Sequence, residues 1–349
     1  MDADASAAQP DQPPAGRRLI EHPILYLALL ALYAASFSEG LIPPEGDAWP
    51  APRPAPPGRS LEDLLRHPRE APFGLAAAIV VPLLLGTGLL IGYIIVRAHG
   101  LRVFPHREFP IPPWPGWHLA RAAIVLLVLM RGIAVGIPWL PRLRSLGLIG
   151  HAMPTGVILA LASNLSMLLL CLFVAALVGT RGGSPLRLLG LRGARPTAHP
   201  LAGLAGFLMA YPVILGVGMV MFILGPRVGI PPQPQEVLVH VAALSPRAFA
   251  LILISIAIVT PITEEIVFRG FLHATLRRSM GPLGAILLSS IVFALLHAYL
   301  FGLPALFVIG FLLAWLYERT SSLLPSIVAH AAHNFYTLLL TYFAIHHAL

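Results

Sequence analysis

The sequence predicts an all-α protein, a polytopic transmembrane helix bundle of about eight to nine spans. Hydrophobic residues make up 57% of the 349 residues and charged residues only 11%. In a soluble domain about a quarter of the residues are charged. The apolar residues also form runs that reach the roughly 20 residues a helix needs to cross a bilayer. These observations exclude a soluble protein and indicate an integral membrane protein with several spans.

Hydropathy predicts nine spans, and the loops between them contain proline clusters such as residues 110–115 and 231–234. The first apolar run follows two arginines and could alternatively be a secretory signal. The polar residues 21–23 interrupt that junction, so we expect a retained span. The predicted spans are residues 24–42, 74–97, 118–140, 156–178, 201–224, 247–271, 283–300, 303–319 and 325–345.

The sequence divides into four parts by composition. Residues 1–18 are polar and rich in proline, which predicts a disordered tail. Residues 19–180 hold four spans with few polar groups and have no role that the sequence indicates. A basic connector at 181–200 leads to residues 201–349, which carry nearly all the ionisable groups inside predicted spans. We therefore expect the chemistry after residue 200.

The charge pattern does not indicate a nucleic-acid partner. All 23 basic residues are arginine, and the formal net charge is +8. The arginines are scattered through the loops rather than gathered in a stripe, so they are better interpreted as topology signals and contacts to anionic lipid headgroups. Cys171 is the one cysteine, which rules out an internal disulfide, and its apolar surroundings favour a small core residue.

The first intramembrane polar group is an acidic pair that follows a proline. Glu265 and Arg269 are four residues apart and can pair on one helix face. Glu264 is turned about 100° away, which leaves its carboxylate free for another partner. Pro261 should kink or restart the helix just before the pair. Alternatively, these are two acids at a helix end, solvated at the membrane surface.

Two further groups lie on two other spans. His297 ends the apolar run 285–296, where a single histidine is most often a packed or interfacial residue. His330 and Asn334 are four residues apart, within about 40° of each other on a helix. Together with His333 they place three hydrogen-bonding side chains in five residues, which packing alone explains poorly.

The three groups together predict one hydrolytic site. Separate polar residues would each need a partner in the bilayer, whereas one water-containing cavity would satisfy them all. Glu264 can act as a general base, and His297 can orient or deprotonate the water. His330 and Asn334 can donate hydrogen bonds to a developing oxyanion.

The pattern Glu264-Glu265-x-x-x-Arg269, Phe293-x-x-x-His297 and His330-x-x-x-Asn334 resembles the CAAX protease and bacteriocin-processing (CPBP, or Abi) family, which includes the Ras-converting CAAX endopeptidase. The resemblance covers about residues 200–345 and implies a membrane-embedded endopeptidase. It implies the same four catalytic residues and a structural Glu265–Arg269 pair. His333 lies three residues from His330 on nearly the same helix face and could be a supporting group or a spare metal ligand. The four N-terminal spans lie outside it.

The resemblance leaves two mechanisms open, because the family has often been described as metalloproteases. A zinc ion could use Glu264, His297 and His330, the usual three protein ligands plus water. Asparagine is a poor zinc ligand, however, and no HExxH spacing occurs. The residue types favour a glutamate-dependent mechanism with no metal cofactor.

Two other classes of function compete with the peptidase. The same acids and histidines could form the proton relay of a transporter, although the sequence shows no internal repeat. A catalytically silent scaffold or immunity-type protein is the other alternative, and the presence of every motif residue argues against it. The arginine-rich, lysine-free composition suggests a bacterial inner membrane, with a peptide, a bacteriocin precursor or a membrane protein as substrate.

Overall fold

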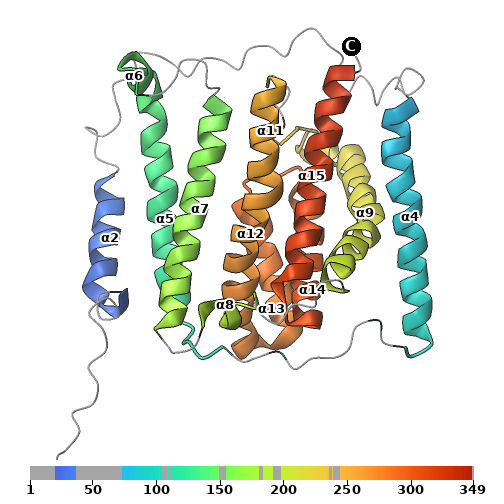
Figure 1. The fold of residues 1–349 in the computed structure, drawn as a ribbon, viewed down its shortest axis with the longest axis horizontal. Coiled ribbons are helices and arrows are strands. Elements are labelled where there is room, and N and C mark those ends of the chain that lie inside the picture. Colours follow the sequence, from blue (N-terminus) through green and yellow to red (C-terminus); the bar gives the residue numbers. More distant parts are fainter. Residues whose placement is uncertain are drawn as a thin grey trace, which may run out of the picture.

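The computed structural model describes residues 20–36, 73–101, 103, 109, 112–148, 155–180, 184–191, 198–235, 238 and 244–347. The predicted tail, 1–18, lies outside the described residues. Every regular element in these ranges is helical, so the predicted all-α bundle is confirmed (Figure 1). The α-helices are α2 (Pro23–Ala35), α4 (Phe73–Ala98), α5 (His118–Gly136), α6 (Leu140–Ser145), α7 (Thr155–Gly179), α8 (Pro185–Leu188), α9 (Ala198–Leu224), α11 (Pro246–Ile254), α12 (Thr260–Glu265), α13 (Ala274–Leu296), α14 (Leu303–Thr320) and α15 (Leu323–His347).

Seven helices among the described residues are long and apolar enough to cross a membrane. One of them, Pro246–Leu296, has 51 residues and would extend roughly 76 Å if it were straight, more than twice the thickness of the hydrocarbon core. It turns back at Gly281, which has φ 72° and ψ −179° and precedes Pro282. The two predicted spans 247–271 and 283–300 are therefore two helices joined at Gly281, and the chain is an integral multi-pass membrane protein.

The first predicted span, 24–42, is only partly described. Its described part is α2, which has 13 residues, fewer than a full crossing requires, and residues 37–42 lie outside the described residues. Two arginines of α5 bind its ends: Arg121 donates to the Glu21 carbonyl, and Arg131 donates to the Ser36 carbonyl at 2.9 Å. The two arginines of α5 thus bind the chain at both ends of the neighbouring short helix.

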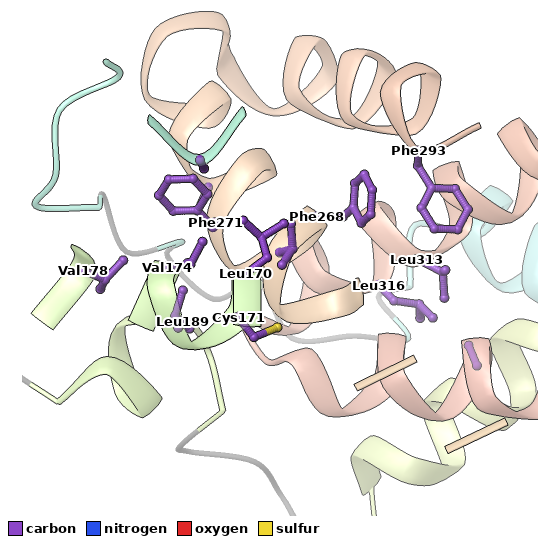
Figure 2. Packing of buried hydrophobic residues seen from close by; sticks show 14 of the residues in the cluster. Leu170, Cys171, Val174, Val178, Leu189, Phe268, Phe271, Phe293, Leu313 and Leu316 are labelled. Carbon is purple, nitrogen blue, oxygen red and sulfur yellow. The ribbon is translucent and has the colours of Figure 1, made fainter. Parts of the chain in front are cut away.

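The core runs through the middle of the bundle and joins α7 to the helices that follow residue 260 (Figure 2). Phe268 and Phe271 project from the kinked helix between α7 on one side and α13 and α14 on the other. Large side chains fill the interface and leave little of their surface exposed, which fixes the distance between these helices. Buried members include Leu170, Val174, Val178, Leu189, Phe293, Leu313 and Leu316.

Helices of the first 180 residues flank the later ones on two sides. In Figure 1, α2, α5 and α7 lie at one end of the bundle and α4 lies at the other, beside α9. Proline determines where α4 docks, because Pro82 has no N–H for the Ala78 carbonyl four residues before it. The Tyr336 hydroxyl of α15 donates to that carbonyl at 2.7 Å. Tyr211 of α9 lies 2.8 Å from the same hydroxyl and so donates to it.

A second proline, in α9, also leaves a backbone carbonyl without its helical donor. Pro212 leaves the Leu208 carbonyl without its helical donor, and Gly86 of α4 packs directly against this carbonyl. A Cβ at residue 86 would lie only 2.0 Å from the Leu208 oxygen, so glycine is required for this approach. The contacts of α4 therefore gather where the backbone of α4 or α9 is irregular.

We expect Tyr336→Phe to lower the thermal-unfolding midpoint in detergent, because it leaves the Ala78 carbonyl without a donor, at a cost of about 1 kcal/mol. The matched background is Pro82→Ala, which restores an N–H to α4. In that background, loss of the Tyr336 hydroxyl should lower the thermal-unfolding midpoint by a smaller amount. Equal losses in the two backgrounds would contradict this account of α4 docking.

Candidate active site

The helix that carries the acidic pair is irregular on both sides of it. The π-helical turns η4 (Ser255–Val259) and η5 (Ile266–His273) flank α12. In η4 the Thr260 N–H bonds the Ser255 carbonyl, so the next carbonyl, that of Ile256, faces residue 261. Pro261 has no N–H to offer. Asn334 Nδ2 of α15 donates to the Ile256 carbonyl at 2.9 Å and so replaces the missing donor.

The acidic pair ends α12 with one side chain fully buried. Glu265 Oε1 accepts from Arg269 Nη1 at 2.7 Å, which is the pairing that the spacing of four residues predicts. Both side chains are buried, and Arg269 Nη2 also donates to the Gly310 carbonyl of α14 at 3.1 Å. The interpretation of these acids as solvated groups at a membrane surface is therefore wrong for Glu265.

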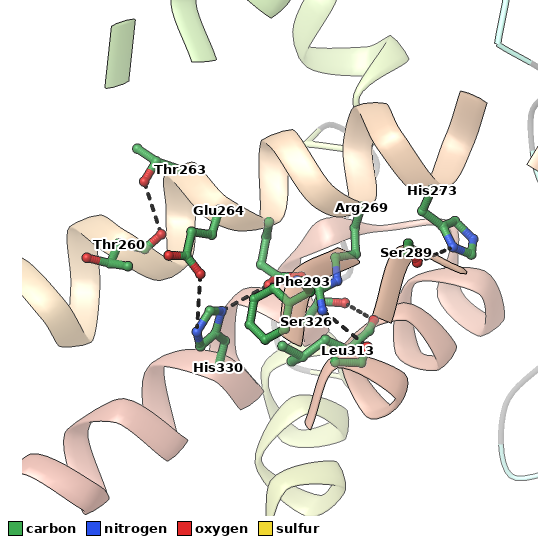
Figure 3. A network of polar contacts seen from close by, with 12 residues as sticks. Thr260, Thr263, Glu264, Arg269, His273, Ser289, Phe293, Leu313, Ser326 and His330 are labelled. Carbon is green, nitrogen blue, oxygen red and sulfur yellow. Dashed lines mark hydrogen bonds and ion pairs between the residues drawn. The ribbon is translucent and has the colours of Figure 1, made fainter. Parts of the chain in front are cut away.

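His330 joins the two glutamates (Figure 3). Its Nδ1 lies 3.0 Å from Glu265 Oε1, and its Nε2 lies 3.8 Å from Glu264 Oε2. A carboxylate held by an arginine can only accept, so Nδ1 of His330 carries a proton. Oε2 of Glu264 and Oε2 of Glu265 are both buried and have no hydrogen-bond partner among the described residues.

The ring of Phe293 brings His297 to this cluster. Its centroid lies 4.6 Å from the ring of His297 and 5.7 Å from that of His330. The Arg269 guanidinium lies over the same ring at 4.4 Å. His297 Nδ1 lies 2.7 Å from the Phe293 carbonyl, which only accepts, so Nδ1 holds the proton and Nε2 is left as an acceptor.

The remaining predicted residues lie on α15 beside this cluster. The ring centroid of His333 lies 6.2 Å from that of Phe207 on α9. Asn334 is one turn beyond His330, with its amide on the Ile256 carbonyl. Glu264, Glu265, Arg269 and His330 therefore form a continuous polar group, with His297 attached through Phe293.

A second buried polar group was missed by the sequence analysis. His273 Nε2 lies 3.2 Å from Glu318 Oε2, and Arg277 Nε donates to Glu318 Oε1 at 2.9 Å. The predicted span ended at 271, which placed these side chains in a loop, but the helix continues beyond them to the kink at Gly281. The signal was available, because residues 265, 269, 273 and 277 are polar at every fourth position.

The donor set does not match a zinc site in this conformation. Among the described residues, no three His, Cys, Asp or Glu side chains come together as a metal-binding group. His330 has both ring nitrogens directed at glutamates, and His297 has only Nε2 available. Glu264, His297 and His330 therefore do not form a ready-made set of three ligands, and we derive no step through a metal.

Comparisons with known proteins bear on the same segment. A family model described as Type II CAAX prenyl endopeptidase Rce1-like matches residues 246–336, which begin at α11 and end in α15. Residues 246–336 are therefore a domain similar to that family. This domain contains Glu264, His297, His330 and Asn334, whereas α4, α7 and α9 lie outside it.

One curated relative is similar to part of this chain. YdiL of Bacillus subtilis (strain 168), named as a candidate membrane peptidase, is 35% identical over 94 residues. The alignment covers 27% of this chain and 38% of YdiL. No solved structure matches the chain at a significant level. The resemblance to the CPBP family is thus confirmed for the domain that carries the candidate site.

We expect Arg269→Met to destabilise the protein strongly, because it leaves the buried Glu265 carboxylate without its cation, at a cost of about 3–5 kcal/mol. The double variant Glu265→Gln/Arg269→Met removes both charges and should unfold at a higher temperature than Arg269→Met alone. Thermal unfolding in detergent measures both. A midpoint for Arg269→Met equal to that of the wild type would contradict a structural role for the pair.

Proposed function

We propose that this protein is a membrane-embedded endopeptidase of the CPBP family that hydrolyses peptide bonds with a water molecule activated by Glu264. The observation that carries the proposal is the buried group of Glu264, His330, Glu265 and Arg269, in which the Glu264 carboxylate faces His330 and takes no part in the Glu265–Arg269 ion pair. Its place in a matched domain and the name of YdiL support the same class of reaction.

In the proposed reaction, Glu264 removes a proton from water, and the water oxygen bonds to the carbonyl carbon of the scissile peptide. The Nε2 acceptor of His297 supports this step, because it can hold the second proton of the water. Glu264 then delivers its proton to the leaving nitrogen as the carbon–nitrogen bond breaks. The products are a carboxylic acid and an amine, and transfer of the remaining water proton from the acid to the amine gives a carboxylate and an ammonium group.

Positive charge on His330 would stabilise the oxyanion. Its Nδ1 proton is directed at Glu265, so Nε2 can donate only when the ring is an imidazolium. Asn334 has a second amide proton beyond the one bound to Ile256, and we assign it the other oxyanion hydrogen bond. Glu265, Arg269 and His333 would then support these groups without touching substrate.

The substrate of the proposed enzyme is a peptide or a membrane protein that reaches the bundle from the bilayer. We place the protein in the inner membrane of a bacterium. The competing scaffold and transporter functions require no peptide cleavage, so the appearance of new chain termini distinguishes them from the peptidase. The experiment can therefore be carried out before any substrate is known.

We expect Glu264→Gln and His297→Ala each to reduce cleavage by at least 1,000-fold and to leave insertion and the unfolding midpoint near those of the wild type. Glutamine keeps the shape of the side chain but cannot accept the water proton, and removal of His297 leaves that water misoriented. Mass spectrometry of new protein termini in membranes that express wild type or variant identifies the cleavage sites. An active Glu264→Gln variant would refute the assigned base.

Treatment with chelators tests whether cleavage depends on a bound metal ion. We expect the purified protein to retain its cleavage rate after treatment with 1,10-phenanthroline and dialysis against EDTA, because the proposed water is activated by protein groups alone. The readout is hydrolysis of a quenched fluorogenic peptide with the cleavage sequence found above. Loss of activity that returns on addition of Zn²⁺ would establish a zinc mechanism instead.

A further inference from the structure

Helix α7 binds the irregular segment that precedes Glu264, although it lies outside the matched domain. Asn164 of α7 accepts a hydrogen bond from Thr260 Oγ1 at 2.7 Å through its Oδ1. Its Nδ2 donates to Ser255 Oγ. Asn164 is thus satisfied at both ends of its amide inside a span that is otherwise almost entirely apolar.

The two partners of Asn164 mark the two ends of the π-helical turn η4. Ser255 is the first residue of η4, and Thr260 is the residue that directly follows its last one. One amide therefore bridges the whole turn. Because it binds both ends with a fixed geometry, it holds the segment in the π conformation rather than in a regular α-helical one.

The same face of α7 makes a second contact two turns later. Cys171 lies seven residues after Asn164, and its thiol donates to the Thr263 carbonyl at 3.1 Å. Thr263 is the residue directly before Glu264. Helix α7 therefore binds the chain on both sides of Pro261, and Asn334 binds the Ile256 carbonyl from α15.

These contacts matter because the segment cannot stabilise itself. A π turn and a proline leave backbone groups without helical partners, and a bilayer offers no water to replace them. If η4 relaxed to an α-helical turn, the register would shift by one residue and Glu264 would rotate by about 100° about the helix axis. That rotation would carry its carboxylate away from His330, which lies 3.8 Å from it in the present register.

We propose that Asn164 is a positioning residue for Glu264, so that the active site of this protein extends to α7, beyond residues 246–336. This inference rests on the proposed peptidase function. Asn164 touches neither water nor substrate in this scheme and acts through Ser255 and Thr260. It gives the N-terminal spans a role in catalysis that the domain match does not supply.

The test compares Asn164→Leu with the wild type and with Ser163→Leu as the matched control. Leucine at 164 keeps a similar volume and loses both hydrogen bonds, whereas Ser163 is exposed on the outer face of the same helix. We expect kcat on the quenched fluorogenic peptide to fall at least tenfold for Asn164→Leu, with KM within twofold of the wild-type value. Ser163→Leu should match the wild type in both constants.

A mutant cycle shows whether Asn164 acts through its two partners. Ser255→Ala/Thr260→Val should reduce kcat to a similar extent, and addition of Asn164→Leu to that pair should cause no further loss. Fully additive losses, a wild-type kcat for Asn164→Leu, or a rise in KM that accounts for the whole effect would each overturn the proposal.

Hydrogen–deuterium exchange of the 255–264 backbone provides a readout that needs no substrate. We expect Asn164→Leu to exchange at least tenfold faster than the wild type in this segment, with α14 unchanged, and unchanged exchange at 255–264 would overturn the proposal. Inactive wild-type protein would count against the peptidase function, and the exchange result would then decide whether Asn164 holds residues 255–264 in place. A wild-type rate for Asn164→Leu beside an inactive Glu264→Gln would refute the inference and leave the peptidase intact.

Discussion

The buried ion pair of Glu265 and Arg269 is the interaction on which the arrangement of the site depends. The Arg269 guanidinium also donates to the Gly310 carbonyl of α14 and lies over the ring of Phe293 from α13. The Glu265 carboxylate contacts His330 of α15. One pair of charges therefore joins four helical segments, in surroundings where an unpaired charge costs several kcal/mol. The same pair fixes the tautomer of His330 and hence what its other nitrogen can do.

Two prolines inside helices leave backbone carbonyls without donors, and polar side chains of neighbouring helices bind those carbonyls. Pro82 and Pro261 each leave a carbonyl without its donor, and a side chain of α15 supplies one in both cases, Tyr336 for Ala78 and Asn334 for Ile256. In water these carbonyls would be solvated, so no protein partner would be required. In a bilayer no water is present to pair with such a carbonyl, so a polar side chain has to lie within hydrogen-bond distance of it. Asn334 has this structural contact in addition to the catalytic role that we propose for it.

The sequence predicted the parts of this protein that depend on local periodicity and missed those that depend on irregular backbone. Hydropathy located the long spans, and a spacing of four residues predicted the Glu265–Arg269 pair. The contact of Asn334 with Ile256 requires the π turn η4, for which the sequence has no periodic signal. Glu318 was missed because its partners His273 and Arg277 were assigned to a loop. Tertiary packing of the kinked helix, rather than hydropathy, decides where that helix ends.

The extent of the site differs from the extent of the family domain for a physical reason. A domain match covers one continuous stretch of the sequence. A kinked intramembrane helix, by contrast, can take its hydrogen-bond partners from any span that packs against it. Here those partners include Asn164 and Cys171 of α7, which contact Ser255, Thr260 and Thr263 within the matched segment. Without α7, the polar groups of Ser255, Thr260 and Thr263 that now bind it would face lipid. Helix α7 is therefore part of the environment of the backbone segment that leads to the acidic pair.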